Sequence, residues 1–184
     1  MLKPSLWTMS ALIVAAAATR LAPHWWNLTA VGAVCLFGGA YFQRWWAAFV
    51  VPLAALAVSD VLLQTFVYHG QGPNYFKYVC FALTVPLGFA LRGRTTFLPV
   101  GAAAIGATVL FFLLSNFEVW FSGHGVSYPR TPAGLLECYI AALPFAKNML
   151  YGNLLFSAVL FGGMEFAKSR RLVIAPHASA IPAA

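Results

Sequence analysis

A cysteine near the start of an apolar segment is the residue with the clearest potential for chemistry. Cys80 follows the polar and aromatic segment Asn74 to Tyr78 and precedes an apolar run to Leu91. The sequence therefore predicts a helix whose first turn meets lipid headgroups, with the thiol just below the rim. A thiolate is a soft metal ligand and a strong nucleophile, so Cys80 beside Lys77 can bind or attack a soft metal centre. Packing as a small hydrophobe is the alternative.

The other two cysteines show less indication of a functional role. Cys35 has only apolar neighbours in sequence, which is typical of packing, and the odd number of cysteines without C-x-x-C spacing indicates neither a zinc site nor a disulfide framework. Cys138 is expected on the same side of the membrane as Cys80. A disulfide between these two remains a structural alternative.

Asp60 is the one carboxylate expected in the middle of a membrane helix. An ionisable group at that depth is costly and normally faces the bundle or a water-filled cavity, so a functional role and a structural bond to a neighbouring helix are both open. His24 and His69 lie at predicted outer helix ends, where a single histidine is more often solvated than metal-bound. No motif of an ATPase, zinc protease or serine hydrolase occurs in the sequence.

The composition requires a membrane environment. The 184 residues are 61% hydrophobic and only 8% charged, whereas soluble domains are about one quarter charged. The first apolar run lacks a small-x-small cleavage site, so we expect a retained helix. The eleven Lys and Arg residues are scattered at the ends of apolar runs, which indicates membrane orientation and not nucleic-acid binding.

We expect an all-α integral membrane protein with six transmembrane helices. A hydrocarbon core of about 30 Å needs about 20 apolar residues per helix. The expected spans are 5–21, 28–43, 46–68, 75–91, 97–115 and 145–167. Residues 1–171 would form this transmembrane domain, and residues 172–184 would form a disordered cytoplasmic tail.

Basic residues predict the orientation of these helices. Cytoplasmic termini place on the inside Lys3, Arg44, Arg92, Arg94, Lys168, Arg170 and Arg171. The outside then carries Arg20, Lys77, Arg130 and Lys147. The positive-inside rule favours this arrangement, with the first, third and fifth loops outside.

The fifth external loop, from Asn116 to Pro144, is too long for a simple connection. We expect Thr131 to cap a short helix with Pro132 in its first turn, ended by Pro144. That helix is too short to span a bilayer, so it is expected to lie in the interface or to fold over the bundle as a lid.

Small residues recur on the first predicted helix. Ala11 and Ala15, with Ala18 a further turn on, form a stripe that allows another helix to approach closely. The stripe fits packing within the bundle and docking of a partner equally well.

The short helices, the aromatic and amide-rich outer face and the alanine stripe together resemble the substrate-binding S components of energy-coupling factor (ECF) transporters. More specifically, four segments resemble BtuM, the solitary S-component family for vitamin B12. They are Arg20 to Asn27, the Ser59-Asp60 pair, Tyr78-Val79-Cys80 and the run from Ser115 to Phe145.

The resemblance implies a bacterial cytoplasmic (inner) membrane transporter for cobalamin or cobinamide. Cys80 matches the cysteine that serves the family as an axial ligand of cobalt and is needed for decyanation of cyanocobalamin. Ala11 and Ala15 match the motif that docks on the shared transmembrane partner. Uptake would occur with or without an ECF module that hydrolyses ATP.

A corrinoid is a large, flat ligand with an amide fringe, so its site requires an outward cavity lined by aromatic and amide groups. The expected ligand-binding residues are His24, Trp25, Trp26, Asn27, Asn74, Tyr75, Tyr78, Asn116, Tyr128 and Tyr139. Two alternatives stay open. One is an S component for another vitamin or a metal with Cys80 merely packed, and the other is a membrane thiol redox protein that uses Cys80 and Cys138.

Overall fold

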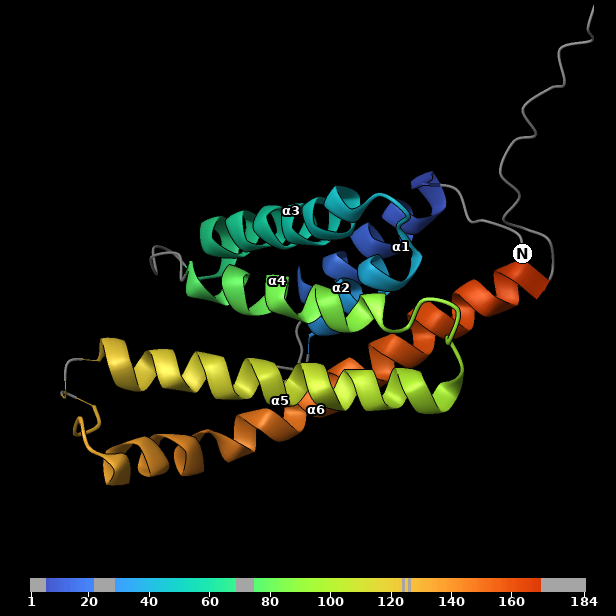
Figure 1. The fold of residues 1–184 in the computed structure, drawn as a ribbon. Helices are drawn as coiled ribbons and strands as arrows, with labels where there is room; N and C mark the ends of the chain where they lie inside the picture. Colours follow the sequence, from blue (N-terminus) through green and yellow to red (C-terminus); the bar gives the residue numbers. More distant parts are fainter. Residues whose placement is uncertain (1–5, 22–28, 69–74, 124, 126, 170–184) are drawn as a thin grey trace, which may run out of the picture.

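The described part of the chain forms six α-helices (Figure 1). The computed structural model describes residues 6–21, 29–68, 75–123, 125 and 127–169. The helices are α1 (Leu6–Ala18), α2 (Val31–Tyr41), α3 (Trp45–Leu63), α4 (Phe76–Phe89), α5 (Phe97–Ser122) and α6 (Pro132–Ser169). A 3₁₀ turn (Thr19–Leu21) extends α1, and a π-helical turn (Gln64–Tyr68) extends α3. The all-α prediction is confirmed for the described part of the chain.

Three segments are long and apolar enough to cross a membrane, namely Trp45–Val67, Phe97–Ser122 and Pro132–Ser169. These segments indicate a membrane protein, as the composition predicts. The other three helices are shorter. At a rise of 1.5 Å per residue, α2 covers only about 17 Å of a core of about 30 Å. The structure therefore does not confirm six full spans.

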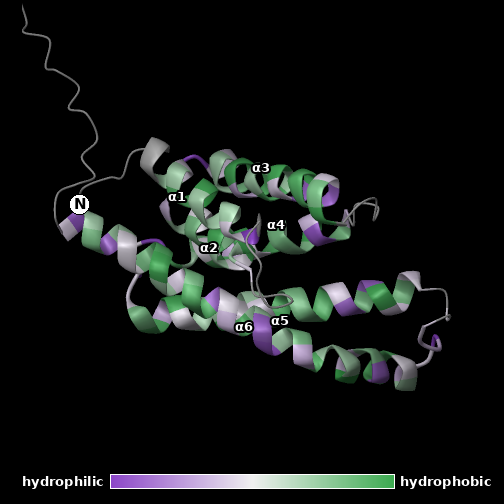
Figure 2. Ribbon diagram, turned by 180° about the vertical axis from the view of Figure 1, so that it is seen from behind, coloured by the Kyte–Doolittle hydropathy of each residue, from purple (hydrophilic) through white to green (hydrophobic). Residues whose placement is uncertain are grey.

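The surface of the bundle that faces away from its core is apolar. Figure 2 shows hydrophobic residues over much of α3 and α5. Large side chains such as Val58, Phe97, Leu98 and Val109 are exposed there. A soluble monomer rarely exposes so much apolar surface, whereas a lipid-facing surface is expected to be of this kind.

The short helix α2 is the centre of the fold. All of its residues from Val31 to Gly39 are buried, and it contacts each of the other five helices. Its Phe37 ring meets Phe161 of α6 edge to face, with 5.5 Å between ring centroids.

Glycine lets α2 approach α4 closely. A Cβ atom on Gly39 would collide with the Val85 carbonyl of α4, and one on Gly88 would collide with the Leu36 carbonyl of α2. The two backbones are thus in direct contact, so the position of α4 is fixed against the centre of the bundle.

The bundle has two ends with different polar groups. We define the Asp60 end by the end of α3, the start of α4 and the α5–α6 connection, and the Arg92 end by the α2–α3 and α4–α5 turns. At the Arg92 end, the Arg92 guanidinium donates to the Gly39 and Phe42 carbonyls at 3.1 and 2.7 Å. Which end faces the cytoplasm remains a prediction from the basic residues.

The prediction of a long fifth loop is wrong. Helix α5 continues to Ser122, and α6 is one helix from Pro132 to Ser169 with Pro144 inside it, so the connection is only residues 123–131. A proline removes one backbone hydrogen bond but does not end a helix whose flanking turns pack against a neighbour, and α6 packs along α5. The predicted cap is confirmed, because the Gly134 amide donates to Thr131 Oγ1 at 3.2 Å.

Candidate functional site

Asp60 lies at the centre of a polar network that joins three helices. Its side chain is buried, with 6% of its surface exposed. Oδ1 accepts from the Arg20 guanidinium at 2.8 Å, and Oδ2 accepts from Lys77 Nζ at 2.7 Å and from the Tyr78 hydroxyl at 2.6 Å. The carboxylate faces the bundle, as predicted, but it lies in the last turn of α3 and not in the middle of the helix.

Two cations share this one carboxylate. Arg20 and Lys77 each form an ion pair with Asp60. Arg20 also donates to the Ser59 hydroxyl, while its buried Nε has no partner. Loss of one member of such a network is strongly destabilising, because it leaves a charge unpaired in a medium of low dielectric constant.

The sequence indicated the members of this network but not their pairing. Lys77 was expected beside Cys80, and Arg20 was expected only as a basic residue at a helix end. The pairing could have been predicted, because an acid within a membrane helix needs a basic partner. The ends of the neighbouring apolar runs contain only a few basic residues that could pair with Asp60.

Cys80 lies one turn inside α4, as predicted, and follows Tyr78 of the Asp60 network by two residues. Its side chain is fully buried. The next residue, Phe81, packs on Phe111 of α5 with 4.4 Å between ring centroids. The sulfur therefore lies inside the bundle, and a ligand can reach it only if the elements around it move.

Further predicted ligand residues lie on the hairpin of α5 and α6. The Asn116 amide donates to the Phe112 carbonyl at 2.8 Å, and the Tyr139 hydroxyl donates to the Leu113 carbonyl at 2.9 Å. Cys138 contacts the Asn116 carbonyl with Sγ at 3.5 Å. The hairpin thus brings Asn116, Cys138 and Tyr139 together.

Of the remaining predicted ligand residues, two are described by the structure and the others are not. Tyr75 is 74% exposed at the start of α4, and Tyr128 is half-buried in the α5–α6 connection. His24, Trp25, Trp26, Asn27 and Asn74 lie outside the described residues. Their role at the site stays a prediction.

Two hollows follow the α5–α6 hairpin. One of about 120 Å³ is lined by Asn116, Ser115 and Met149 among others, and one of about 540 Å³ is lined by Thr108, Pro144 and Lys147 among others. Neither is lined by Cys80.

All three cysteines are buried free thiols. The alternative of a disulfide between Cys80 and Cys138 is thus not realised in this structure. Among the described residues, no three His, Cys, Asp or Glu side chains gather to hold a metal ion.

The predicted alanine stripe lies on the outer surface of α1. Ala11, Ala15 and Ala18 are exposed, together with Val14. The stripe is thus available to groups outside the chain.

Comparison with known proteins gives the family of the chain. It belongs to a family of unknown function (DUF6580), whose model matches residues 1–178. Comparisons with curated proteins and with solved structures gave no match.

Proposed function

We propose that this DUF6580 member binds a corrinoid, cobalamin or cobinamide, at the Asp60 end and carries it across a bacterial cytoplasmic membrane. The observation that supports this most directly is the position of Cys80. The thiol follows Tyr78 of the Asp60 network on α4 and precedes Phe81, which packs on the α5–α6 hairpin that carries Asn116, Tyr128 and Tyr139. A soft ligand is thereby combined with aromatic and amide groups.

The proposed chemistry at Cys80 is a ligand substitution at cobalt(III). The sulfur forms a bond to cobalt, and the bond from cobalt to cyanide breaks with its electron pair on the cyanide carbon. The thiol proton leaves with cyanide as hydrogen cyanide, so no electron donor is required. Coordination favours the deprotonated sulfur, because metal binding and thiol ionisation are coupled.

Access to the sulfur would come from movement of the α5–α6 hairpin. The contact of Phe81 with Phe111 joins this hairpin to α4 beside Cys80. The connection at its tip is short, and Gly125 there has a φ of 79°, which favours glycine. The moving element is therefore proposed to be the whole hairpin, in place of the loop lid that the sequence suggested.

Transport is proposed to involve docking of α1 on a transmembrane partner of the ECF type. The exposed Ala11 and Ala15 supply a surface on which a helix can approach closely. Replacement of both by Leu should reduce uptake by cells and leave corrinoid binding intact. Loss of binding in this variant would assign the stripe to internal packing.

Titration of the purified protein with cyanocobalamin tests the proposal. Binding should shift the visible spectrum of the corrinoid with a saturable stoichiometry, and slow loss of cyanide should follow. An unchanged spectrum at protein concentrations of about 50 μM, well above a micromolar Kd, would reject corrinoid binding.

The burial of Cys80 favours one alternative, in which the thiol only packs and the site takes another vitamin or a metal. A further alternative is thiol redox chemistry between Cys80 and Cys138, which would require these free thiols to meet. The titration and a gel run with and without dithiothreitol together separate the three, because a redox pair would give a mobility shift sensitive to dithiothreitol and no corrinoid spectrum.

A further inference from the structure

A lysine lines the larger of the two hollows on the α5–α6 hairpin, which we call the Lys147 hollow. Its volume is about 540 Å³, and both helices of the hairpin contribute to it. Ile105, Val109 and Leu143, which also line it, are about half exposed. The hollow therefore opens away from the core, toward the surroundings of the bundle, and Lys147 itself is exposed there.

Lys147 lies at the depth of the middle of a membrane-spanning helix. Thr108 and Val109 line the same hollow and stand near the middle of the 26 residues of α5. The four-carbon stem of a lysine is too short to carry its ammonium from there to the headgroups, about 15 Å away. A charged group at this depth is costly unless an opposite charge pairs with it.

Within the described part of the chain, Lys147 forms no hydrogen bond and no ion pair. The other polar side chain that lines the hollow is Thr108. Its hydroxyl donates to the Ala104 carbonyl and accepts from the Asn153 amide, each at 2.9 Å. Thr108 is thus satisfied inside the bundle, and the partner of Lys147 must come from outside the chain.

A second copy of the chain does not supply an anion at this depth. Copies inserted in the same orientation place equal residues at equal depths, and all four acidic side chains lie in the described ranges. Glu137 precedes Lys147 by ten residues, which is about 15 Å along a helix. Glu118 lies close to the end of α5. Asp60 and Glu165 lie near the ends of α3 and α6 and already form ion pairs.

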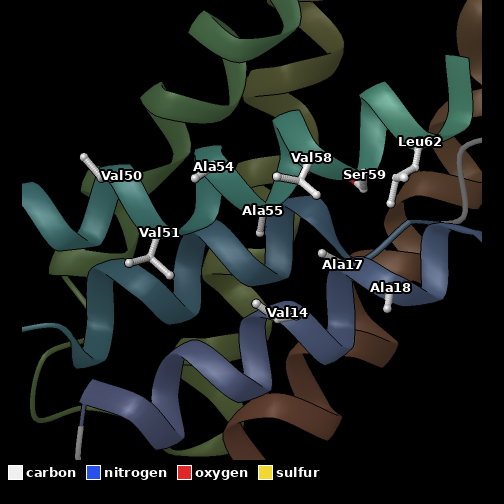
Figure 3. Close-up of a pocket in the computed structure, with 10 residues that line it drawn as sticks. All are labelled: Val14, Ala17, Ala18, Val50, Val51, Ala54, Ala55, Val58, Ser59 and Leu62. Atoms are coloured by element: carbon white, nitrogen blue, oxygen red, sulfur yellow. The ribbon is translucent and has the colours of Figure 1, made fainter. Parts of the chain in front are cut away.

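The apolar groove between α1 and α3 shows the contrast (Figure 3). Its volume is about 390 Å³, and its lining includes one hydroxyl, of Ser59, and no charged side chain. Acyl chains of the bilayer can cover such a surface without any specific partner. The Lys147 hollow differs because its cation selects an occupant by charge.

We propose that the outer face of the α5–α6 hairpin docks a transmembrane helix of another protein, and that this helix carries an aspartate or glutamate that pairs with Lys147. The anions of lipid headgroups lie at the membrane surface, whereas a spanning helix holds a carboxylate at mid-depth. The hairpin lies on the opposite side of the bundle from α1 and α3 (Figure 1). This docking surface is therefore separate from the alanine stripe of α1, and it does not depend on corrinoid binding.

Photo-crosslinking of the full chain tests the proposal. Benzoylphenylalanine, a photoreactive amino acid, is incorporated at position 143 in the cells that naturally make the protein. Irradiation should give an adduct with a membrane protein that has an aspartate or glutamate at the centre of a spanning segment, as identified by mass spectrometry. An adduct of two copies of this chain, an adduct with a protein that has no such acid, or the absence of any protein adduct would overturn the proposal.

Substitutions of Lys147 show whether its charge holds the partner. Lys147→Met should reduce the adduct about tenfold, as expected for loss of one charge-assisted hydrogen-bonded pair, and Lys147→Arg should retain it. The melting temperature of solubilised Lys147→Met should stay near that of the wild type, because no acid of the chain binds Lys147. A probe at position 61, where Val61 is 62% exposed on α3, is the control, and its adducts should not respond to Lys147→Met. An undiminished adduct at position 143 in Lys147→Met would overturn the ion pair.

Exchange of the two charges separates a direct pair from an indirect effect. Lys147→Asp should abolish the adduct, since two carboxylates would then meet in hydrocarbon. Replacement of the partner's central acid by lysine in the same cells should restore it. An adduct that stays absent after the exchange would overturn direct pairing with Lys147.

Discussion

The Asp60 carboxylate and the Cys80 sulfur lie at the same end of the molecule but have different surroundings. Asp60 is bound by donors from Arg20, Lys77 and Tyr78, so both of its oxygens are satisfied. Cys80 is covered by apolar contacts and requires a rearrangement before it can act. We therefore expect substitutions of Asp60 to affect stability and substitutions of Cys80 to affect chemistry.

Replacement of Cys80 by alanine should abolish loss of cyanide from bound cyanocobalamin, because a methyl group has no electron pair to offer to cobalt. Binding through aromatic and amide contacts can survive in part. The measurement is the visible spectrum of cyanocobalamin incubated with the solubilised variant. Cys35→Ala and Cys138→Ala are the matched controls, and unaltered cyanide loss in Cys80→Ala, or an equal defect in Cys138→Ala, would contradict the assignment.

Replacement of Asp60 by asparagine should destabilise the protein by about 3 kcal/mol, since two cations lose their shared anion. For a chain of this size the melting temperature in detergent should fall by about 10 °C. Combining Asp60→Asn with Lys77→Met should recover part of this loss, because one of the two cations that shared the Asp60 carboxylate is removed. Glu137→Gln, at an exposed position on α6, is the control and should change little. A neutral effect of Asp60→Asn would show that the network does not hold the three helices together.

At the scale of elements, the contact between α2 and α4 depends on two glycines. Gly39→Ala should destabilise the protein by about 1–3 kcal/mol, because the new methyl group meets the α4 backbone, which cannot move aside as a side chain can. Thermal melts in detergent measure the effect. Gly101→Ala on α5 is the matched control, since nothing lies within 4 Å of a Cβ there. That change should be neutral or stabilising by up to about 1 kcal/mol, and equal behaviour of the two variants would argue against a close α2–α4 contact.

The sequence predicted six apolar helices and a separate short helix before the sixth, and the structure joins these last two into α6. The predicted helix starts at residue 97 and at Pro132 agree with the starts of α5 and α6. Pro144 was misleading, because its effect depends on what packs against the helix, and this is a property of the tertiary structure. The pairing of Arg20 and Lys77 with Asp60 was likewise hidden, since it joins residues far apart in the chain.

At the scale of the whole molecule, the distribution of basic residues predicts that the Asp60 end faces outward. A membrane-impermeant maleimide added to intact cells should label a Tyr75→Cys variant, because position 75 is 74% exposed at that end. An Arg94→Cys variant at the exposed Arg92 end should be labelled only after permeabilisation. The native thiols give little background, since all three are buried. The opposite labelling pattern would reverse the orientation and place the candidate site on the cytoplasmic side.

The burial of α2 by the other five helices has a consequence for how the protein is inserted into the membrane. The machinery that inserts membrane proteins selects segments of about 20 apolar residues, and α2 has only 11 helical residues. Its surface from Val31 to Gly39 is covered by protein, so its stable environment exists only after the other helices have gathered. A nascent chain that ends at Tyr41 is therefore expected to leave α2 outside the hydrocarbon, and this segment should acquire protection from protease only once α3 and the later helices have been synthesised.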